Sequence, residues 1–380
     1  MRFPSVEPPK ARAFWARPPH LAHAPEQPPK RHARFDDFAD FKIRAQAPLH
    51  RTFAQELEIG LRNYAPKPTK TGVNGSFFLC DSSGKRIAIF KPMNMEAGGR
   101  KNHRLDAAHN VQFRNSILPG QGAGNEVLAY ALDHQALGGR YEIPKTILVC
   151  LSHAAFEGQE LGSAQQFISN ARALSELSPE ERARIPETEW AKLNFRLISG
   201  STDAHLGNIL YCDATQKLYL IDSGDDFVGE DGECQYYNPW TVEPRCNTPL
   251  STSESSFLEH LDAGKIMQVF EQQALANEQA HPKLKVSVDK YLTQIIRLML
   301  AKTAGHYQLS PAEWSGIMSS HRGPDRHIHR GDLEHIYDQY CRPYSKLYST
   351  WKEASQVILW DPIQQELNNA ARAQLEKRRF

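Results

Sequence analysis

The sequence predicts an α+β fold with two lobes, and three observations support this prediction. Residues 72–79 and 86–92 are two β-rich runs joined by the turn signal Asp81-Ser-Ser-Gly84, which predicts a β-hairpin. A helical pattern at 124–133 and a further strand-like run at 143–150 follow. Beyond residue 250 the apolar residues recur at helical spacing. We therefore expect a small lobe that contains the sheet and a larger, mainly helical lobe.

The predicted hairpin carries the first candidate site residues. Gly72 and Gly75 lie in a turn before the first strand, where glycine tolerates unusual backbone angles, and Ser76 follows them. Lys91 ends the second strand, and a lysine there can reach the phosphates of a nucleotide under the turn as a compact point charge. Taken alone, Lys91 also fits a solvated lysine on an edge strand.

The predicted helix at 124–133 supplies a carboxylate that could pair with Lys91. Apolar residues between 127 and 132 have helical spacing, and Glu126 is expected in the first turn. A buried ammonium needs a partner, and a carboxylate on a helix can provide it. The alternative is that Glu126 complements the dipole at the helix N-terminus.

The segment Ser201–Leu210, together with Asp222, is the most informative stretch of the chain. Asp203 precedes Asn208 by five residues, and the strand-like run 217–221 leads directly to Asp222. A kinase needs one carboxylate beside the attacking hydroxyl, an Asn oxygen on Mg²⁺, and a second carboxylate that bridges metal and phosphates. The spacing alone also fits a turn followed by a capped strand. The glycine turn, strand Lys, helix Glu, Asp–Asn loop and strand Asp nevertheless occur in the chain order of a kinase.

Several separate motifs agree in order between residues 70 and 230. They are Gly75-Ser-Phe-Phe78, Phe90-Lys-Pro92, Leu118-Pro-Gly-Gln-Gly122, Asn125-Glu-Val-Leu-Ala-Tyr130, Gly162-Ser-Ala-Gln165, Thr202-Asp-Ala-His-Leu-Gly-Asn208 and Ile221-Asp-Ser-Gly224. On these motifs the chain resembles the phosphatidylinositol 3-/4-kinase-related superfamily, most closely its type II phosphatidylinositol 4-kinase-like branch. That branch includes atypical protein kinases. The resemblance implies a two-lobed, protein-kinase-like fold, with ATP as donor and Mg²⁺ or Mn²⁺ as metal.

The resemblance also implies a role for each candidate residue. Lys91 would contact the α- and β-phosphates, and Glu126 would hold Lys91. Asp203 would be the catalytic base, and Asn208 and Asp222 would bind the metal. By the same resemblance, Gly72, Gly75 and Ser76 belong to the nucleotide site.

Two positions depart from the family pattern and leave the acceptor to be argued separately. Ala204 stands where the family usually has arginine, and Asp225 where an apolar residue is usual. Residues 223–233 contain five carboxylates and no Lys or Arg. In kinases this region faces the acceptor, so it would repel an anionic inositol lipid and attract a basic polypeptide. We therefore predict phosphoryl transfer to Ser or Thr of a protein.

Three alternatives to a protein kinase stay open at this point. The first is a phosphatidylinositol 4-kinase-like lipid kinase, and the second is a nucleotide-binding pseudokinase or interaction module. The third is nucleotidyl transfer, such as AMP transfer, which related folds also perform. The presence of all the polar elements favours an enzyme over a pseudokinase.

The predicted domain organisation has four parts. They are a Pro-rich basic arm at 1–45, a small lobe at 46–160, a large lobe at 161–310 and a helical C-terminal extension at 311–380. Long helices are expected at 257–278 and 288–302.

The extension contains a candidate anion site. Its members are Arg322, Arg326, Arg330, His327 and His329. Guanidinium groups bind phosphate well, so an inositol phosphate or phosphoinositide headgroup is the expected ligand and a candidate activator. A surface loop of ordinary charge is the alternative.

Composition narrows the class of protein further. The chain has 380 residues and a formal net charge of +1. It contains no apolar run of about 18 residues, so we expect no membrane span. Six scattered cysteines without C-x-x-C pairs fit a reducing, cytoplasmic location, and no metal-binding histidine spacing is present. No secretory signal and no nucleic-acid partner are expected, while delivery into another cell is left open. Trp351, Trp360 and the terminal basic residues fit a peripheral membrane surface or, alternatively, packing on a neighbouring domain.

Overall fold

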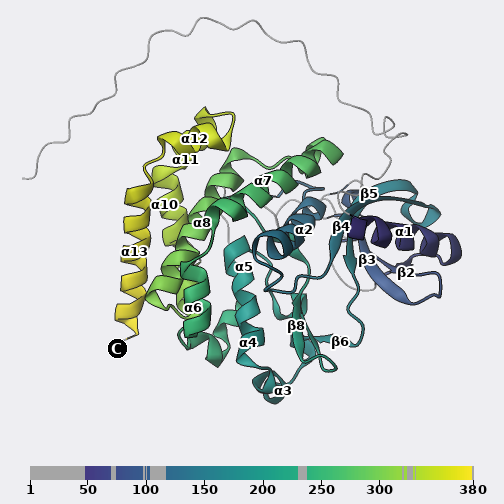
Figure 1. The fold of residues 1–380 in the computed structure, drawn as a ribbon, viewed down its shortest axis with the longest axis horizontal. Coiled ribbons are helices and arrows are strands. Elements are labelled where there is room, and N and C mark those ends of the chain that lie inside the picture. Colours follow the sequence, from purple (N-terminus) through teal and green to yellow (C-terminus); the bar gives the residue numbers. More distant parts are fainter. Residues whose placement is uncertain are drawn as a thin grey trace, which may run out of the picture. The chain divides into compact units, whose positions relative to one another are not determined.

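The computed structural model describes residues 48–69, 74–96, 99, 101–102, 117–229, 238–318, 321–322, 328–329 and 331–378. All elements below belong to the compact unit Arg44–Phe380, and the arm expected at 1–45 lies outside the described residues. Within this unit, Figure 1 shows the strands of the earlier residues grouped apart from the helices that follow residue 250. The α+β fold predicted from the sequence is therefore confirmed.

A five-stranded antiparallel sheet forms the first part of this unit. Its order is β1-β2-β3-β5-β4. The strands are β1 (Lys67–Pro68), β2 (Phe77–Cys80), β3 (Arg86–Pro92), β4 (Thr146–His153) and β5 (Gly158–Gln166). The predicted hairpin is β2–β3, in which Phe77 pairs with Phe90. The expected lobe boundary after residue 160 falls inside β5, so the sheet extends beyond it to Gln166.

Two helices contact this sheet. Helix α1 (Pro48–Asn63) packs on β2 and β4, and α2 (Gly122–Ala131) packs on β4 and β5. Phe53 and Leu57 of α1 are buried. Helix α2 also contacts α7 (Ala263–Ala280) of the helical part. It therefore connects the sheet with the helices, which places its side chains between the two.

A second, three-stranded sheet carries the predicted catalytic loop. Strands β6 (Ala171–Ala173), β7 (Ile209–Cys212) and β8 (Lys217–Leu220) pair in that order, all antiparallel. Asn208 immediately precedes β7, and Asp222 lies two residues after β8. Because Ile209 pairs with Leu220, the hairpin brings the two ends that carry these residues together.

The helical part is organised around α8 (Val288–Tyr307), which is buried along most of its length. Between α2 and α7 the chain forms the helices α3 (Pro179–Arg184), α4 (Glu187–Trp190), α5 (Asn194–Ser199) and α6 (Thr252–Glu259). The single helix expected at 257–278 is in fact α6 and α7. Asp262 separates them because its side chain caps α7 by accepting a hydrogen bond from Lys265 N at 2.9 Å. The helix expected at 288–302 is α8 and extends to Tyr307.

Most of the C-terminal helices pack on α8 rather than standing apart from it. They are α9 (Pro311–Met318), α10 (Asp332–Tyr340), α11 (Arg342–Leu347), α12 (Trp351–Val357) and α13 (Trp360–Lys377). Trp351 stacks on Tyr291 of α8 with ring centroids 5.5 Å apart. Trp360 begins α13 and Arg378 follows its end, so a helix of 18 residues, about 27 Å long, separates them. Arg378 pairs with Glu313 of α9, and Arg379 lies outside the described residues.

Among the described residues, no helix is both long and apolar enough to cross a bilayer.

Candidate functional site

Lys91 lies on an inner strand and is held by two carboxylates. Strand β3 lies between β2 and β5, and Lys91 pairs in register with Ser163. Its Nζ forms ion pairs with Glu126 of α2 and with Asp222, whose Oδ1 is 2.8 Å away. The Lys91 side chain is only 15% exposed. The alternative of a solvated edge lysine is therefore wrong, and three residues distant in sequence meet at one ammonium group.

Glu126 is buried in the second turn of α2, not in the first turn as expected. The helix begins at Gly122, and the Glu126 side chain is 1% exposed. Its Oε2 has no hydrogen-bond partner within the described part of the chain. Burial raises the pKa of Glu126 to about 7, against the opposing effect of Lys91. Glu126 therefore serves Lys91 rather than the helix dipole.

The two carboxylate partners of Lys91 keep its ammonium group protonated. Burial alone lowers the pKa of Lys91, but the carboxylates of Asp222 and Glu126 outweigh burial and raise that pKa. The ammonium is thus charged at every physiological pH.

Two further polar residues, which sequence reasoning missed, fix helix α2 in place. Glu96 is buried and accepts hydrogen bonds from the backbone N–H groups of Gly120 (2.9 Å), Gly122 (3.0 Å) and Ala123 (2.8 Å). Asn125 donates from Nδ2 to the carbonyl oxygens of Gly224 and Asp226, both at 2.9 Å. The helix that carries Glu126 is therefore attached directly to the loop that carries Asp222.

The loop of Asp203 and Asn208 is closed by its own hydrogen bonds. Asn208 Nδ2 donates to the Asp203 carbonyl oxygen at 2.8 Å and to Asp203 Oδ2 at 3.3 Å. His205 Nδ1 accepts from Gly207 N at 2.9 Å, so Nε2 carries the proton of the neutral ring, 3.8 Å from Asp203 Oδ1. Sequence reasoning did not single out His205.

The Asp203 carboxylate lies in the electrostatic field of Asp222. Its side chain is 41% exposed. Burial and the charge of Asp222 raise the pKa of Asp203, while His205 lowers it. A carboxylate destabilised in this way is a better proton acceptor than an ordinary surface Asp.

Asp222 has an uncommon backbone conformation. Its φ of 60° and ψ of 58° lie in the left-handed region, which Asp tolerates better than most residues. Its side chain is 37% exposed. The neighbouring Ile221 N donates to the Asn208 carbonyl oxygen at 3.1 Å, which joins the two predicted metal-binding segments.

Asp226 corrects the electrostatic argument for a protein acceptor. The sequence places it among five carboxylates expected to face the acceptor, yet it is fully buried and pairs with Arg196 at 3.3 Å. Ser199 Oγ donates to the same carboxylate at 3.0 Å. Glu230, Asp231 and Glu233 lie outside the described residues. The argument for a protein acceptor therefore loses one of its five charges.

The glycine turn makes contacts within the chain itself. Gly72 lies outside the described residues. Gly75 N donates to the Met95 carbonyl oxygen at 2.8 Å, and a Cβ at Gly75 would lie 2.8 Å from Met95 Cβ. The Ser76 hydroxyl is 2.6 Å from that of Thr69. Gly75 is thus required for close packing, and nucleotide contacts of Gly75 and Ser76 stay a prediction.

The predicted anion site falls largely outside the described residues. Arg326, His327 and Arg330 are not described, and neither are the side chains of Arg322 and His329. The backbones of the last two lie on β9 (His321–Arg322) and β10 (Ile328–His329), which pair antiparallel. The anion site stays a prediction.

The residues around Asp222 fit a magnesium ion bound together with a phosphate. The described residues contain no cluster of three or more His, Cys, Asp or Glu that could hold a metal alone. Magnesium is usually held by one or two protein oxygens and by substrate phosphates, so such a cluster is not required. Asn208 Nδ2 is directed at Asp203, which leaves its amide oxygen as the candidate ligand atom, on a segment that is hydrogen-bonded to the segment of Asp222.

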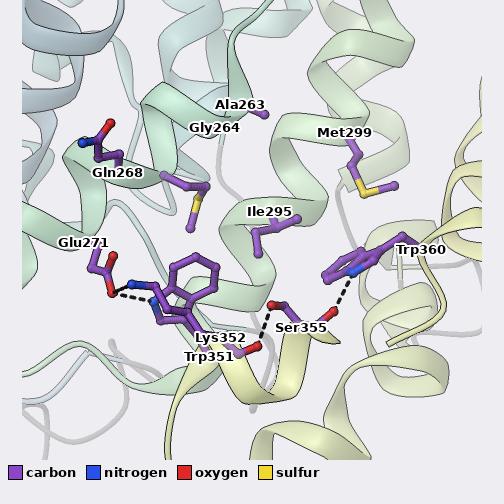
Figure 2. A pocket seen from close by; sticks show the side chains of 11 residues that line it. Ala263, Gly264, Gln268, Glu271, Ile295, Met299, Trp351, Lys352, Ser355 and Trp360 are labelled. Atoms are coloured by element: carbon purple, nitrogen blue, oxygen red, sulfur yellow. Dashed lines mark hydrogen bonds and ion pairs between the residues drawn. The ribbon is translucent and has the colours of Figure 1, made fainter. Parts of the chain in front are cut away.

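A hollow among the helices lies apart from the candidate site residues. It is an open groove of about 550 Å³ formed by α7, α8, α12 and α13 (Figure 2). Met267, Ile295 and Met299 line it with both tryptophans of the predicted aromatic segment. Its polar groups bind one another, since Glu271 pairs with Lys352 at 2.8 Å. None of the predicted catalytic residues lines this groove.

Comparison with known proteins gives distant relatives that are named as kinases. No family model matches the chain. Phosphatidylinositol 4-kinase gamma 4 of Oryza sativa subsp. japonica is 30% identical over 220 residues, 54% of this chain and 38% of that protein. Phosphatidylinositol 4-kinase gamma 2 of Arabidopsis thaliana is 25% identical over 282 residues, 67% of this chain and 48% of that protein. The chain thus spans less than half of these relatives, and the similarity supports a kinase-like protein.

Among solved structures, the Helicobacter pylori proinflammatory kinase CtkA matches 68% of this chain and 98% of that chain. The sequence identity is 9% and the TM-score is 0.26, too low to carry an argument about fold or function.

Proposed function

We propose that this chain is an ATP-dependent kinase that transfers the γ-phosphoryl group to a hydroxyl. One observation carries the proposal: Lys91 is held between Glu126 and Asp222, next to a loop that pairs Asp203 with Asn208. Enzymatic phosphoryl transfer depends mainly on positioning and on electrostatic stabilisation, and these are the groups that it needs. The names of the distant relatives support the same reaction class.

Each of these residues has a chemical task in the proposal. Glu126 fixes the Lys91 ammonium so that it can bind phosphate oxygens. Asp222 and Asn208 would hold Mg²⁺, which neutralises phosphate charge when bound. Asp203 accepts the proton of the acceptor hydroxyl, a task that its raised pKa favours.

For the acceptor we propose a Ser or Thr hydroxyl of a protein. Asp203 and Asp222 are two partly exposed carboxylates at the site, and they favour a neutral or basic segment over an anionic headgroup. A phosphoinositide hydroxyl is the second candidate, because the relatives are named phosphatidylinositol 4-kinase gamma.

The test is incubation with γ-³²P-ATP and Mg²⁺, separately with mixed proteins and with phosphoinositide vesicles. We expect label in protein. Label in lipid alone would support the second candidate, and ATP binding without any transfer would support a pseudokinase. Transfer of label from α-³²P-ATP would indicate nucleotidyl transfer instead.

Asp213→Ala is the matched control for substitutions of the site carboxylates Asp203 and Asp222. It removes a carboxylate that is 56% exposed in the β7–β8 turn. It should leave transfer unchanged. Absence of ATP binding by the wild-type protein would overturn the proposal.

A further inference from the structure

The guanidinium of Arg196 is the centre of a sealed polar cluster directly behind the site. Arg196 lies on α5 and is fully buried. Its Nη1 donates to Ser223 Oγ at 3.1 Å and to both carboxylate oxygens of Asp226 at 3.3 Å. Its Nη2 donates to the carbonyl oxygens of Ile221 and of Asn208, the latter at 3.3 Å. One side chain therefore binds both of the segments predicted to hold the metal.

These contacts bracket the residue with the left-handed backbone. Arg196 binds Ile221 on one side of Asp222 and Ser223 on the other. A left-handed non-glycine residue persists only where its surroundings fix it. The two flanking contacts supply that constraint, and the constraint determines where the Asp222 carboxylate points.

The second function of the cluster is to fix the distance between the two metal-binding segments. Arg196 binds the Asn208 carbonyl oxygen, and this oxygen also accepts from Ile221 N. Asp226 neutralises the guanidinium, and Asn125 of α2 holds the Asp226 carbonyl oxygen at 2.9 Å. A change in the position of Arg196 would therefore displace Asp222 relative to Asn208.

We infer that Arg196, neutralised by Asp226, is a positioning residue that sets the affinity of the site for the metal–nucleotide complex. This inference rests on the proposed kinase function and adds to it a determinant of metal affinity. Because Arg196 is fully buried, it would act on the site through its contacts on both sides of Asp222. Groups that orient metal ligands commonly change metal affinity by about 10- to 100-fold when they are altered.

Arg196→Lys is the variant that separates this role from a purely structural one. Lysine keeps the positive charge opposite Asp226, so the buried carboxylate stays paired. It is a point charge without the planar fork, so a single ammonium that stays with Asp226, the partner of Nη1, cannot also replace Nη2 at the carbonyl oxygens of Ile221 and Asn208. Arg245→Lys is the matched control, because Arg245 also binds main-chain carbonyl oxygens, including Ile185 O at 2.8 Å, on α3 and its flanks.

The measurement is ATP affinity by calorimetry as a function of Mg²⁺ concentration, with a parallel titration in EDTA. For Arg196→Lys we expect an apparent Mg²⁺ affinity lower by about tenfold and a metal-free ATP affinity within about twofold of wild type. Arg245→Lys should match wild type in both titrations. A folded Arg196→Lys variant with wild-type Mg²⁺ dependence would overturn the inference, whatever its melting temperature.

If Arg196→Lys does not fold, the variant Ser223→Ala tests the inference instead. It removes one acceptor beside Asp222 and leaves no buried charge unpaired. We expect the same direction of change, about two- to threefold in Mg²⁺ affinity, and an unchanged Mg²⁺ affinity would overturn the inference. Failure of the wild-type protein to bind ATP with Mg²⁺ would instead reject the proposed function itself.

Discussion

Two ion clusters lie close together in this molecule, and they differ in their access to solvent. In the first, Lys91 and Asp222 are 15% and 37% exposed. In the second, Arg196 and Asp226 are both completely buried. In the open cluster, solvent access allows the ion pair of Lys91 and Asp222 to be replaced by contacts with a ligand. In the sealed cluster, Arg196 is already hydrogen-bonded to backbone carbonyl oxygens. Under the proposed function, the open cluster is the part that would bind a ligand, and the sealed cluster is the part that holds its geometry.

The difference has an energetic consequence. Removing one partner of a fully buried ion pair leaves a charge without compensation and typically costs about 3–5 kcal/mol of stability. At the open cluster, solvent reaches Asp222 and reduces such a penalty. Substitutions in the open cluster should therefore affect activity first, and those in the sealed cluster should affect stability first.

The largest expected effect is on turnover at the open cluster. Asp222→Ala should lower the rate of phosphoryl transfer by at least about 10³-fold, because it removes a carboxylate that organises the charge around the phosphates. Asp222→Asn should do the same while keeping a residue that tolerates the left-handed backbone. Label transfer and thermal melting measure the two effects, and wild-type transfer by either folded variant would contradict the assignment.

The next effect concerns the proposed base. Asp203→Ala should lower the maximal rate by about 10²- to 10⁴-fold, the usual contribution of a general base. ATP affinity should change little, because the carboxylate contacts the acceptor hydroxyl. Steady-state kinetics and ATP titration separate these quantities, and an equal loss of ATP affinity would assign Asp203 to metal binding or structure.

The sealed cluster is tested through stability. Asp226→Asn should lower the free energy of unfolding by about 3 kcal/mol, because Arg196 is left charged and uncompensated. Urea denaturation measures this change, with Asp213→Asn as the surface control. A loss below about 1 kcal/mol, the usual value for an exposed pair, would show that the cluster is not sealed in solution.

The smallest effect is a pH dependence from Glu126. Its pKa in the folded state, about 7, lies above the ordinary value of 4.5, so the folded state binds a proton more readily than the unfolded state. The contribution of Glu126 to stability is therefore largest below pH 4.5 and declines as the pH rises towards 7. The melting temperature of wild type relative to Glu126→Gln should fall across this range. A constant difference would contradict the raised pKa.

The sequence was sufficient to predict that Glu126 pairs with Lys91, whereas the ion pair of Lys91 with Asp222 was not predicted. Local patterns place Lys91 on a strand, Glu126 on a helix and Asp222 at the end of a strand. The order of these elements along the chain limits how the three residues can meet. The hairpin pairing that brings Asn208 to Asp222 follows from the same local signals. The metal and nucleotide roles of these residues stay predictions.

The sealed cluster could not be predicted, because its residues owe their roles to tertiary contacts. Asp225 and Asp226 are adjacent acidic residues, and nothing local shows that Asp226 is the one that pairs, fully buried, with Arg196 thirty residues earlier. Glu126 was placed in the first turn because its helix was expected from residue 124. The helix begins at Gly122, where the distant Glu96 caps its N–H groups.

Calorimetric titration of ATP with Mg²⁺ into wild type and Lys91→Met tests the central claim most directly, because it asks whether the open cluster binds the phosphates. The account predicts binding by wild type and an affinity lower by at least about tenfold, or 1.4 kcal/mol, in Lys91→Met. Equal affinities in the two proteins, or no binding by wild type, would contradict it.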